Sequence, residues 1–337
     1  LVPYKDIRSG GNYPAEALLA KCEHILASRG LPVDAITSYW DFPVSTILPI
    51  LQKKYNVSGA SLESVLKCED KYWSRVEQEN SIPEHTPKFV GFNPHQEGLK
   101  IEDLGLSVPF WIKPRKSVSS YLAFRIDTQE HFDQALEVIR EEIGALNKPF
   151  QSILDRADLP PEIDNLHPDT CMAEESIFAS SQCTQEGYVH DGEVHIYGTV
   201  DSIHTPGGKS SFSHYLYPSR LPQDVQDQMT EISKRFIEHI GYDNAAFNIE
   251  YFWDEESGRI SLLEINTRIS KSHSPLFDMV DGSSHHKVMM DLALGNKPEM
   301  PQGEGEFPYA AKFMLRHFGG DGYVLRGPSA RTVEKIK

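Results

Sequence analysis

The sequence is 337 residues long and carries a formal net charge of −16 at pH 7, with 39% hydrophobic and 24% charged residues. This length and composition are typical of a globular protein of two or three packed lobes, and they exclude a disordered or fibrous protein. The acidic charge argues against a nucleic-acid partner. The lack of a run of ~20 apolar residues or of a signal-peptide pattern argues against a membrane partner.

The first segment, residues 1–68, is expected to form an α/β lobe. Apolar residues recur at helical spacing over residues 15–29 and again over 44–55. An extended run from Val33 to Ser38 lies between these helices, and a third helix begins after Ser61, a residue type that caps helices. This alternation is typical of an open α/β sheet. Since such a lobe normally begins with a strand, we expect that an N-terminal strand is missing from the sequence.

The middle of the chain predicts a small central α+β lobe of about residues 109–180. It follows a polar helix that begins at Asp70 and ends before Pro83. The elements expected within the lobe are strands over residues 109–114, 121–126 and 171–176 and a helix over residues 129–146.

The next segment, about residues 181–298, predicts an antiparallel lobe. Asp191-Gly192 is a strong hairpin signal between two apolar strands. The expected strands cover residues 184–190, 193–200, 246–253 and 259–266, and the expected helices cover residues 224–240 and 285–294. Residues 299–337 are expected to form a small β-containing extension that is cut at its end.

The cysteines predict a reducing compartment. Cys22, Cys68, Cys171 and Cys183 have no Cys-x-x-Cys spacing and lie in segments with helix or strand patterns. We therefore expect unpaired core thiols and not a disulfide framework or a zinc site, which agrees with a cytoplasmic location.

The sharpest group of polar residues lies on the predicted hairpin of residues 246–266. Alternation places Asn248 and Glu250 on one face of the first strand and Glu264, Asn266 and Arg268 on one face of the second. Two carboxylates and an amide oxygen suit a hard cation such as Mg²⁺, and Arg268 can stabilise phosphoryl charge. The alternative is a set of solvent-facing polar residues on an amphipathic hairpin.

Glu250 followed by Glu-x-Asn-x-Arg at residues 264–268 resembles the metal-binding end of the ATP-grasp superfamily, in particular carbamoyl-phosphate synthetase large chains and biotin carboxylases. The likeness runs from about Leu62 to Gly295. It implies the ATP-grasp fold, in which a Rossmann-like α/β lobe precedes an ATP-grasp domain, here residues 69–298, whose two α+β lobes enclose ATP. It also implies that Mg²⁺ or Mn²⁺ binds the hairpin residues, with Glu250, Glu264 and Asn266 as metal ligands.

The resemblance assigns phosphate-binding roles to several positions. Lys71 and Lys113 match the two basic residues that hold ATP phosphates in this superfamily, although a lone lysine is usually a surface residue. Arg268 takes a catalytic role at the transferred phosphoryl group. His204, in the run His-Thr-Pro-Gly-Gly, matches a loop near the phosphates in carbamoyl-phosphate synthetases, with an exposed turn as the alternative.

The resemblance also implies where the nucleoside binds. Glu174, Glu175 and Ile177 belong to the strand that reads adenine, largely through its main chain. Gln182 matches the position that holds the ribose, where the family often has glutamate. The alternative is an ordinary edge strand that leads into a loop.

Two departures from the family pattern bear on function. The loop Ser117–Ser120 replaces a Gly-rich flap whose amides fold over the phosphates, and serine amides and hydroxyls are expected to serve instead. Ser272 stands where biotin carboxylases have the glutamate that deprotonates bicarbonate. This second departure argues against a bicarbonate-using carboxylase.

The expected function is that of an ATP- and Mg²⁺-dependent carboxylate-amine ligase that acts through an acyl phosphate. Its partners are a small carboxylic acid and an amine, and a homodimer is expected. His204, His214 and His273 are alternatives for taking the amine's proton, and substrate specificity is expected in two polar loops, residues 209–220 and 270–277. A catalytically silent ATP-binding module, a bicarbonate-using carboxylase and a kinase remain alternatives.

Overall fold

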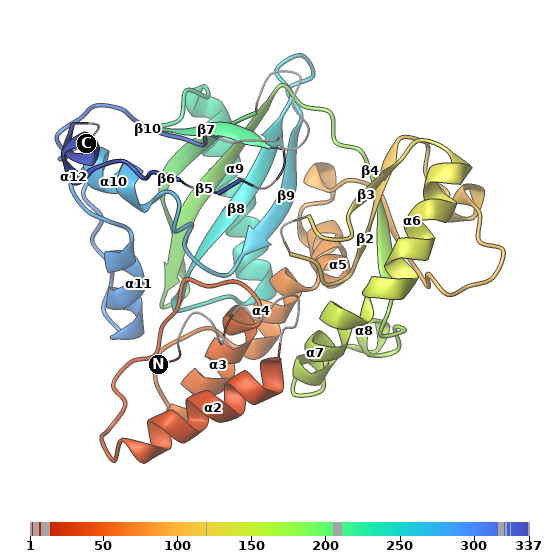
Figure 1. Ribbon diagram of the computed structural model, residues 1–337, viewed down its shortest axis with the longest axis horizontal. Coiled ribbons are helices and arrows are strands. Elements are labelled where there is room, and N and C mark those ends of the chain that lie inside the picture. The colour runs from red at the N-terminus through yellow and green to blue at the C-terminus, as the bar shows by residue number, and fades with distance from the viewer. Residues whose placement is uncertain are drawn as a thin grey trace.

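The computed structural model describes residues 2, 7, 14–118, 120–204, 211–315, 320, 322–323 and 325–335. In these ranges the chain forms a helical N-terminal segment, a small antiparallel sheet and a larger antiparallel sheet (Figure 1). No helix in the described ranges is long and apolar enough to cross a membrane.

The described part of the N-terminal segment consists of helices joined by non-helical connections. It contains α2 (Ala15–Ser28), α3 (Val44–Tyr55) and α4 (Leu62–Glu69), and the Ser61 side chain caps α4 as expected. The strand expected over residues 33–38 is not formed, so the described part of this segment differs from the expected α/β lobe. A strand needs a neighbour for its main-chain groups, and the Ile36 carbonyl accepts instead from the Gln52 side chain at 2.9 Å.

Helix α5 (Lys71–Ser81) connects the helical segment to both sheets. The Asp70 carboxylate caps it by accepting from the amides of Tyr72 and Trp73, at 3.1 and 3.2 Å. The helix ends before Pro83, as expected from the sequence, and a short 3-10 turn follows at Pro83–His85. In Figure 1, α5 lies between the two sheets.

The small sheet has the strand order β1-β4-β2-β3. Its strands are β1 (Phe89–Phe92), β2 (Phe110–Pro114), β3 (Phe124–Ile126) and β4 (Cys171–Glu175), and α6 (Gln129–Glu142) packs against it. Strand β3 is shorter than expected because Ser120 and Leu122 have φ of 60° and 57°, which extended strands do not allow.

The central lobe differs from the expected residues 109–180 at its start and in its interior. Strand β1 precedes that range, and pairs with β4. Helices α7 (Gly144–Leu154) and α8 (Pro161–Asp164) lie within it but bury Phe150 and Ile163 in the core of the N-terminal helices. The helix expected over residues 129–146 ends at Glu142, and α7 begins at Gly144.

The large sheet has the strand order β10-β7-β6-β5-β8-β9. Its strands are β5 (Ser181–His190), β6 (Glu193–His204), β7 (Phe212–Tyr217), β8 (Ala245–Trp253), β9 (Ile260–Asn266) and β10 (Ala310–Phe313). Helix α9 (Gln223–Ile240) packs on one face, and α10 (Ser274–Asp281) and α11 (His286–Ala293) pack on the other (Figure 1).

Three expectations for this sheet need correction. Residues 212–217 of the expected specificity loop form β7, and Ser274–Asp281 forms α10, so both segments are more ordered than polar loops. The extension does not form a separate lobe at Ala310–Phe313, because β10 pairs with β7 and completes the edge of the sheet. Only a short helix, α12 (Ala330–Glu334), follows in the described ranges.

Candidate functional site

A cavity of about 520 Å³ lies between the small and the large sheet. Its walls come from the start of α5, from β2 and β4 of the small sheet, and from β5, β8 and β9 of the large sheet. Every residue to which the family resemblance assigned a metal, nucleotide or catalytic role lines this cavity: Lys71, Lys113, Glu174, Glu175, Ile177, Gln182, His204, Glu250, Glu264, Asn266 and Arg268. His214 and His273 do not line it.

The β8–β9 hairpin presents its polar residues in pairs. Asn248 lies opposite Asn266 and Glu250 lies opposite Glu264, in the antiparallel register that alternation predicts. The Asn266 amide donates to Asn248 at 3.0 Å and to Glu250 at 3.5 Å. A β-bulge follows the Glu250–Glu264 pair, and Leu263 has no partner on β8.

Arg75 on α5 closes the open edge beside this bulge. The guanidinium donates to the carbonyls of Leu262 and Leu263, both at 3.0 Å, so an edge strand keeps its outward carbonyls satisfied. Its Nε also donates to Glu174 at 2.9 Å. One buried side chain therefore ties α5, β4 and β9 together beneath the cavity.

Each expected phosphate-binding cation in the cavity has a carboxylate partner. Lys71 binds Glu264, Lys113 binds Glu174 and Arg268 binds Asp41. Burial alone would raise the pKa of Glu174, but Lys113 and Arg75 outweigh it and hold that pKa at about 2. Burial lowers the pKa of the Lys113 ammonium, and Glu174 offsets only part of that effect.

The paired glutamates of the hairpin differ in their electrostatics. Burial, and then the neighbouring charge of Glu264, raise the pKa of Glu250. Burial acts on Glu264 in the same direction, but Lys71 outweighs it, so the pKa of Glu264 falls below its ordinary value. Glu250 is thus the carboxylate whose charge the protein leaves uncompensated.

The balance of charge in the cavity is negative. Its lining holds six carboxylates, Asp41, Glu69, Glu174, Glu175, Glu250 and Glu264, against four cations, Lys71, Lys113, Lys116 and Arg268. A polyanionic ligand would enter only with additional cations. In the described ranges no three His, Cys, Asp or Glu side chains are grouped to hold a metal. Glu250, Glu264 and the Asn266 amide are therefore only a partial ligand set, which suits Mg²⁺ because this ion takes its other oxygens from ligand and water.

The other end of the cavity is more apolar. Trp111 on β2 and Phe252 on β8 line it together with Ile177. Neither aromatic residue was singled out from the sequence, yet alternation carries the signal, because Trp111 shares a face with Lys113, and Phe252 shares one with Glu250. The Glu175 amide donates a hydrogen bond to the Lys88 carbonyl at 2.9 Å.

Gln182 and His204 form a chain of hydrogen bonds that leads to Glu250. The Gln182 amide donates to Glu250 at 3.2 Å, and its carbonyl oxygen lies 2.8 Å from Nε2 of His204. Burial lowers the pKa of His204, which favours a neutral ring that donates to Gln182. Residues 205–208 of the expected phosphate loop lie outside the described ranges.

The Ser-rich loop that was expected to fold over the phosphates borders the cavity through Ser117 and Ser120, and Ser119 lies outside the described ranges. Lys116 next to this loop binds Glu69 from α4. Asp41 comes from the N-terminal segment and meets Arg268 across 227 positions of sequence, a separation that no periodic pattern can predict.

The comparisons with known proteins begin with a family model. The model described as "Carbamoyl-phosphate synthase L chain, ATP binding domain" matches residues 216–300. The carbamoyl phosphate synthase large chain of Thermus thermophilus is 28% identical over 135 residues, which make up 39% of this chain and 13% of that protein. The chain thus spans a small part of this relative's length.

Two solved structures resemble most of the chain. The L-amino acid ligase from Bacillus licheniformis matches 90% of this chain and 67% of its own, with a TM-score of 0.66 and 16% identity. The biotin carboxylase domain of the Hydrogenobacter thermophilus 2-oxoglutarate carboxylase, solved with MgADP, ADP and bicarbonate, matches 89% of this chain and 61% of its own, with a TM-score of 0.61 and 17% identity. The chain has the ATP-grasp fold. The resemblance to the ATP-grasp superfamily is therefore confirmed.

A second cavity of the ATP-grasp fold, about 130 Å³, adjoins the first. The two cavities share Asp41, Phe212, Glu250 and Arg268. The smaller one extends past Arg268 to the segment Ser270–His273, which follows the β8–β9 hairpin. It offers room for a small molecule beside the carboxylates, on the side away from Trp111.

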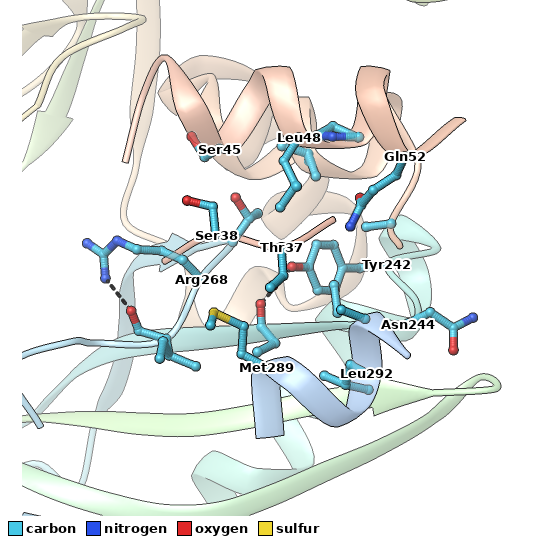
Figure 2. Close-up of a pocket in the computed structure, with 18 residues that line it drawn as sticks. Thr37, Ser38, Ser45, Leu48, Gln52, Tyr242, Asn244, Arg268, Met289 and Leu292 are labelled. Carbon is cyan, nitrogen blue, oxygen red and sulfur yellow. Dashed lines mark hydrogen bonds between the residues drawn. The ribbon is translucent and has the colours of Figure 1, made fainter. Parts of the chain in front are cut away.

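A third cavity, of about 40 Å³, lies where the N-terminal helices meet the large sheet. Figure 2 shows Ser45, Leu48 and Gln52 of α3 above it and Met289 and Leu292 of α11 below it. Its volume suits a few water molecules and not a nucleotide. The Arg268 side chain borders it, and its Nη1 donates to the Ile269 carbonyl at 3.3 Å (Figure 2).

Proposed function

We propose that this chain binds ATP with Mg²⁺ in the 520 Å³ cavity and uses it to activate a small carboxylic acid, which an amine then attacks to give an amide. The observation that carries this proposal is the convergence of the Glu250–Glu264 pair, Asn266, Lys71, Lys113 and Arg268 on one cavity of an ATP-grasp fold. The whole of the carbamoyl phosphate synthase relative is far longer, and fold alone does not give activity. The site chemistry therefore has to support the function.

The charges of the cavity fit a metal-bound triphosphate. Lys71 and Lys113 would exchange their carboxylate partners for phosphate oxygens, while Glu250, Glu264 and Asn266 would hold Mg²⁺. Mg²⁺ supplies charge neutralisation and a template for the phosphates. The apolar residues Trp111 and Phe252 suit a planar base, which the main chain after β4 would read.

Arg268 would contact both the transferred phosphoryl group and the acid, because it lines the 520 Å³ cavity and the smaller cavity beside it. A carboxylate is already ionised at pH 7, so its attack on the γ-phosphorus needs no general base, and a guanidinium stabilises the charge of the transition state. The oxygen–phosphorus bond to the acid forms as the bond to ADP breaks, which leaves an acyl phosphate. Asp41 holds Arg268 in place until a ligand competes for it.

The names of the relatives support the same class of reaction. One resembled structure is an L-amino acid ligase, and another is a biotin carboxylase domain that holds MgADP. The carboxylase alternative would need a base for bicarbonate, and Ser272 is not one. A ligase reaction is therefore the better proposal for this chain.

The test measures release of ADP and phosphate from Mg-ATP across a panel of amino and hydroxy acids, each with and without amine acceptors. We expect one acid to stimulate ADP release. In a separate calorimetric measurement, Lys113→Ala should weaken ATP binding about 10-fold or more, because the variant cannot form the charge-assisted hydrogen bond of Lys113 to a phosphate. Lys234→Ala on the exposed face of α9 is the matched control. Release of ADP that no acid stimulates above the level of Glu264→Ala would contradict the proposal.

A further inference from the structure

The second cavity contains a buried pair of residues that the steps above do not use. Glu186 on β5 is 0% exposed and His273 is 2% exposed, and Nδ1 of His273 lies 2.9 Å from Oε1 of Glu186. An ionised carboxylate can only accept a hydrogen bond from the imidazole nitrogen beside it, so Nδ1 carries the hydrogen. Nε2 is then left as the basic nitrogen of the ring.

The surroundings of this pair fix its orientation. The Ser270 amide donates to Oε2 of Glu186 at 3.3 Å, and the Tyr215 ring meets the His273 ring edge-on, with centroids 4.7 Å apart. The His273 carbonyl accepts from the Leu276 amide at 2.8 Å, where α10 begins. Contacts from a strand, a loop and a helix thus hold the His273 ring in place.

Nε2 of His273 has no hydrogen-bond partner in the described part of the chain, and the residue lines the 130 Å³ cavity. His285 lies on the other side of Glu186, 3.7 Å from Oε2, and burial lowers its pKa to about 4, so it is uncharged at neutral pH. Burial alone would raise the pKa of Glu186, but the hydrogen bond from His273 outweighs it and keeps the carboxylate ionised.

Lys271 also lines the 130 Å³ cavity, and its environment differs from that of the cations of the 520 Å³ cavity. Those four, Lys71, Lys113, Lys116 and Arg268, each have a carboxylate partner. The Lys271 ammonium lies instead 3.6 Å from the centre of the Trp40 ring, and no described carboxylate pairs with it. It therefore retains full capacity to bind an anionic group of a ligand.

We propose that the 130 Å³ cavity receives a small amino acid as the acceptor, with its carboxylate on Lys271 and its amino group at Nε2 of His273. The inference rests on the proposed function, because the shared residues Glu250 and Arg268 place the acyl phosphate at the boundary of the two cavities. It also favours His273 over the other two histidines that the sequence offered for taking the amine's proton. His204 donates to Gln182, and His214 stacks on Phe313 and lines neither cavity.

The ammonium of the acceptor gives one proton to Nε2 of His273, and the free amine attacks the carbonyl carbon of the acyl phosphate. The carbon–nitrogen bond forms and the carbon–oxygen bond to phosphate breaks, and phosphate leaves with that electron pair and the second nitrogen proton. Imidazolium is stabilised by the Glu186 carboxylate, which acts as a positioning residue.

The test compares acceptors that differ in their need for a base. Hydroxylamine is uncharged at pH 7 and traps an acyl phosphate as a hydroxamate without help. We expect His273→Asn to keep hydroxamate formation within about twofold of the unaltered protein and to lose amide formation with amino acids about 100-fold or more, the usual contribution of a general base. Raising the pH should partly restore the amide reaction, since more of the acceptor is then free amine. His131→Asn, on the exposed part of α6, is the control and should change neither rate.

Two further variants separate the roles. Lys271→Met should raise KM for alanine about 10-fold and leave KM for alaninamide, which lacks the carboxylate, unchanged. Glu186→Gln should lower the rate with amino acids and shift its pH profile, while hydroxamate formation persists. Nitrogen NMR of histidine-labelled protein should find Nδ1 of His273 protonated and Nε2 bare, a readout that is independent of activity.

The outcomes distinguish this inference from the function on which it rests. Failure of the unaltered protein to form a hydroxamate with any acid would overturn the proposed function, and this inference with it. Hydroxamate without coupling to any common amino acid would overturn the acceptor site alone. Equal loss of both reactions in His273→Asn, or a proton found on Nε2, would overturn the role of His273.

Discussion

Arg75 offers the sharpest test of how the cavity is held together. Its side chain is 2% exposed and donates to Glu174, to Gln78 and to the carbonyls of Leu262 and Leu263. Arg75→Met keeps most of the apolar stem and removes the charge. Breaking a buried ion pair from one side typically costs about 3–5 kcal/mol, because the partner stays buried without compensation.

The partners of Arg75 set where in that range the loss falls. Glu174 retains Lys113 in the variant, but three neutral acceptors lose their donor. We therefore expect the free energy of unfolding to fall by about 4 kcal/mol, which is roughly a quarter or more of the stability of a typical protein. For a chain of this size the Tm should fall by roughly 6 °C.

Urea denaturation followed by circular dichroism measures this loss. The matched control is Arg235→Met, because Arg235 also leaves a helix to bind a glutamate, Glu84, but both side chains are about half exposed, at 48% and 50%. An exposed pair contributes at most about 1 kcal/mol. If Arg75→Met and Arg235→Met lost equal stability, the argument that Arg75 closes the sheet edge would be refuted.

Three further predictions concern the metal, acid stability and the thiols. Glu250→Gln removes one negative charge from the partial metal ligand set, so it should raise the Mg²⁺ concentration needed for half-maximal ATP binding about 10-fold or more and leave unfolding by urea little changed. The same Mg²⁺ dependence in the variant and the unaltered protein would count against this role of Glu250. The pKa of Glu174 is about 2 in the folded protein against an ordinary 4.5, so its stabilising effect is present above pH 4.5 and is lost as the pH falls toward 2. Between pH 5 and 3 the free energy of unfolding, measured with urea, should therefore fall less in Glu174→Gln than in the unaltered protein. Parallel plots of that free energy against pH for the two proteins would contradict this. All four cysteines are buried and unpaired, and a thiol reagent should modify them only after denaturant is added; rapid modification of the native protein would oppose that expectation.

The ion pairs of the cavity have a consequence for ligand binding. If phosphates bind as proposed, Lys71, Lys113 and Arg268 would leave Glu264, Glu174 and Asp41 at least in part. The carboxylates then need another cation, and Mg²⁺ would serve those on the hairpin. Binding of ATP and of Mg²⁺ should accordingly be cooperative, each strengthening the other.

The hairpin shows how much of a site can be predicted from local pattern. Asn248, Glu250, Glu264 and Asn266 were predicted to share one face, and their register in the sheet agrees. Side chains in a strand alternate with a period of two, so a short stretch of sequence fixes which residues lie together. The same rule would have found Trp111 and Phe252, which lie on the faces of Lys113 and Glu250.

The segment Val33–Ser38 shows where local pattern fails. Its residues favour an extended chain, and the chain there is not helical, but it forms no strand in the described ranges. A strand is defined by its neighbour, and none is available beside α3. Likewise β7 is polar enough to read as a loop, yet it pairs with β6 on one side and β10 on the other.

The sequence by itself determined most helices, the hairpin turns and the faces of the strands, because these depend on residues a few positions apart. Only the tertiary structure decided which charges meet. Hydrogen bonds join Arg75 to Glu174 across 99 positions of sequence, His273 to Glu186 across 87, and Arg268 to Asp41 across 227. Such contacts follow from how sheets and helices pack against one another, and the energy of a buried charge depends on that packing and not on its neighbours in sequence.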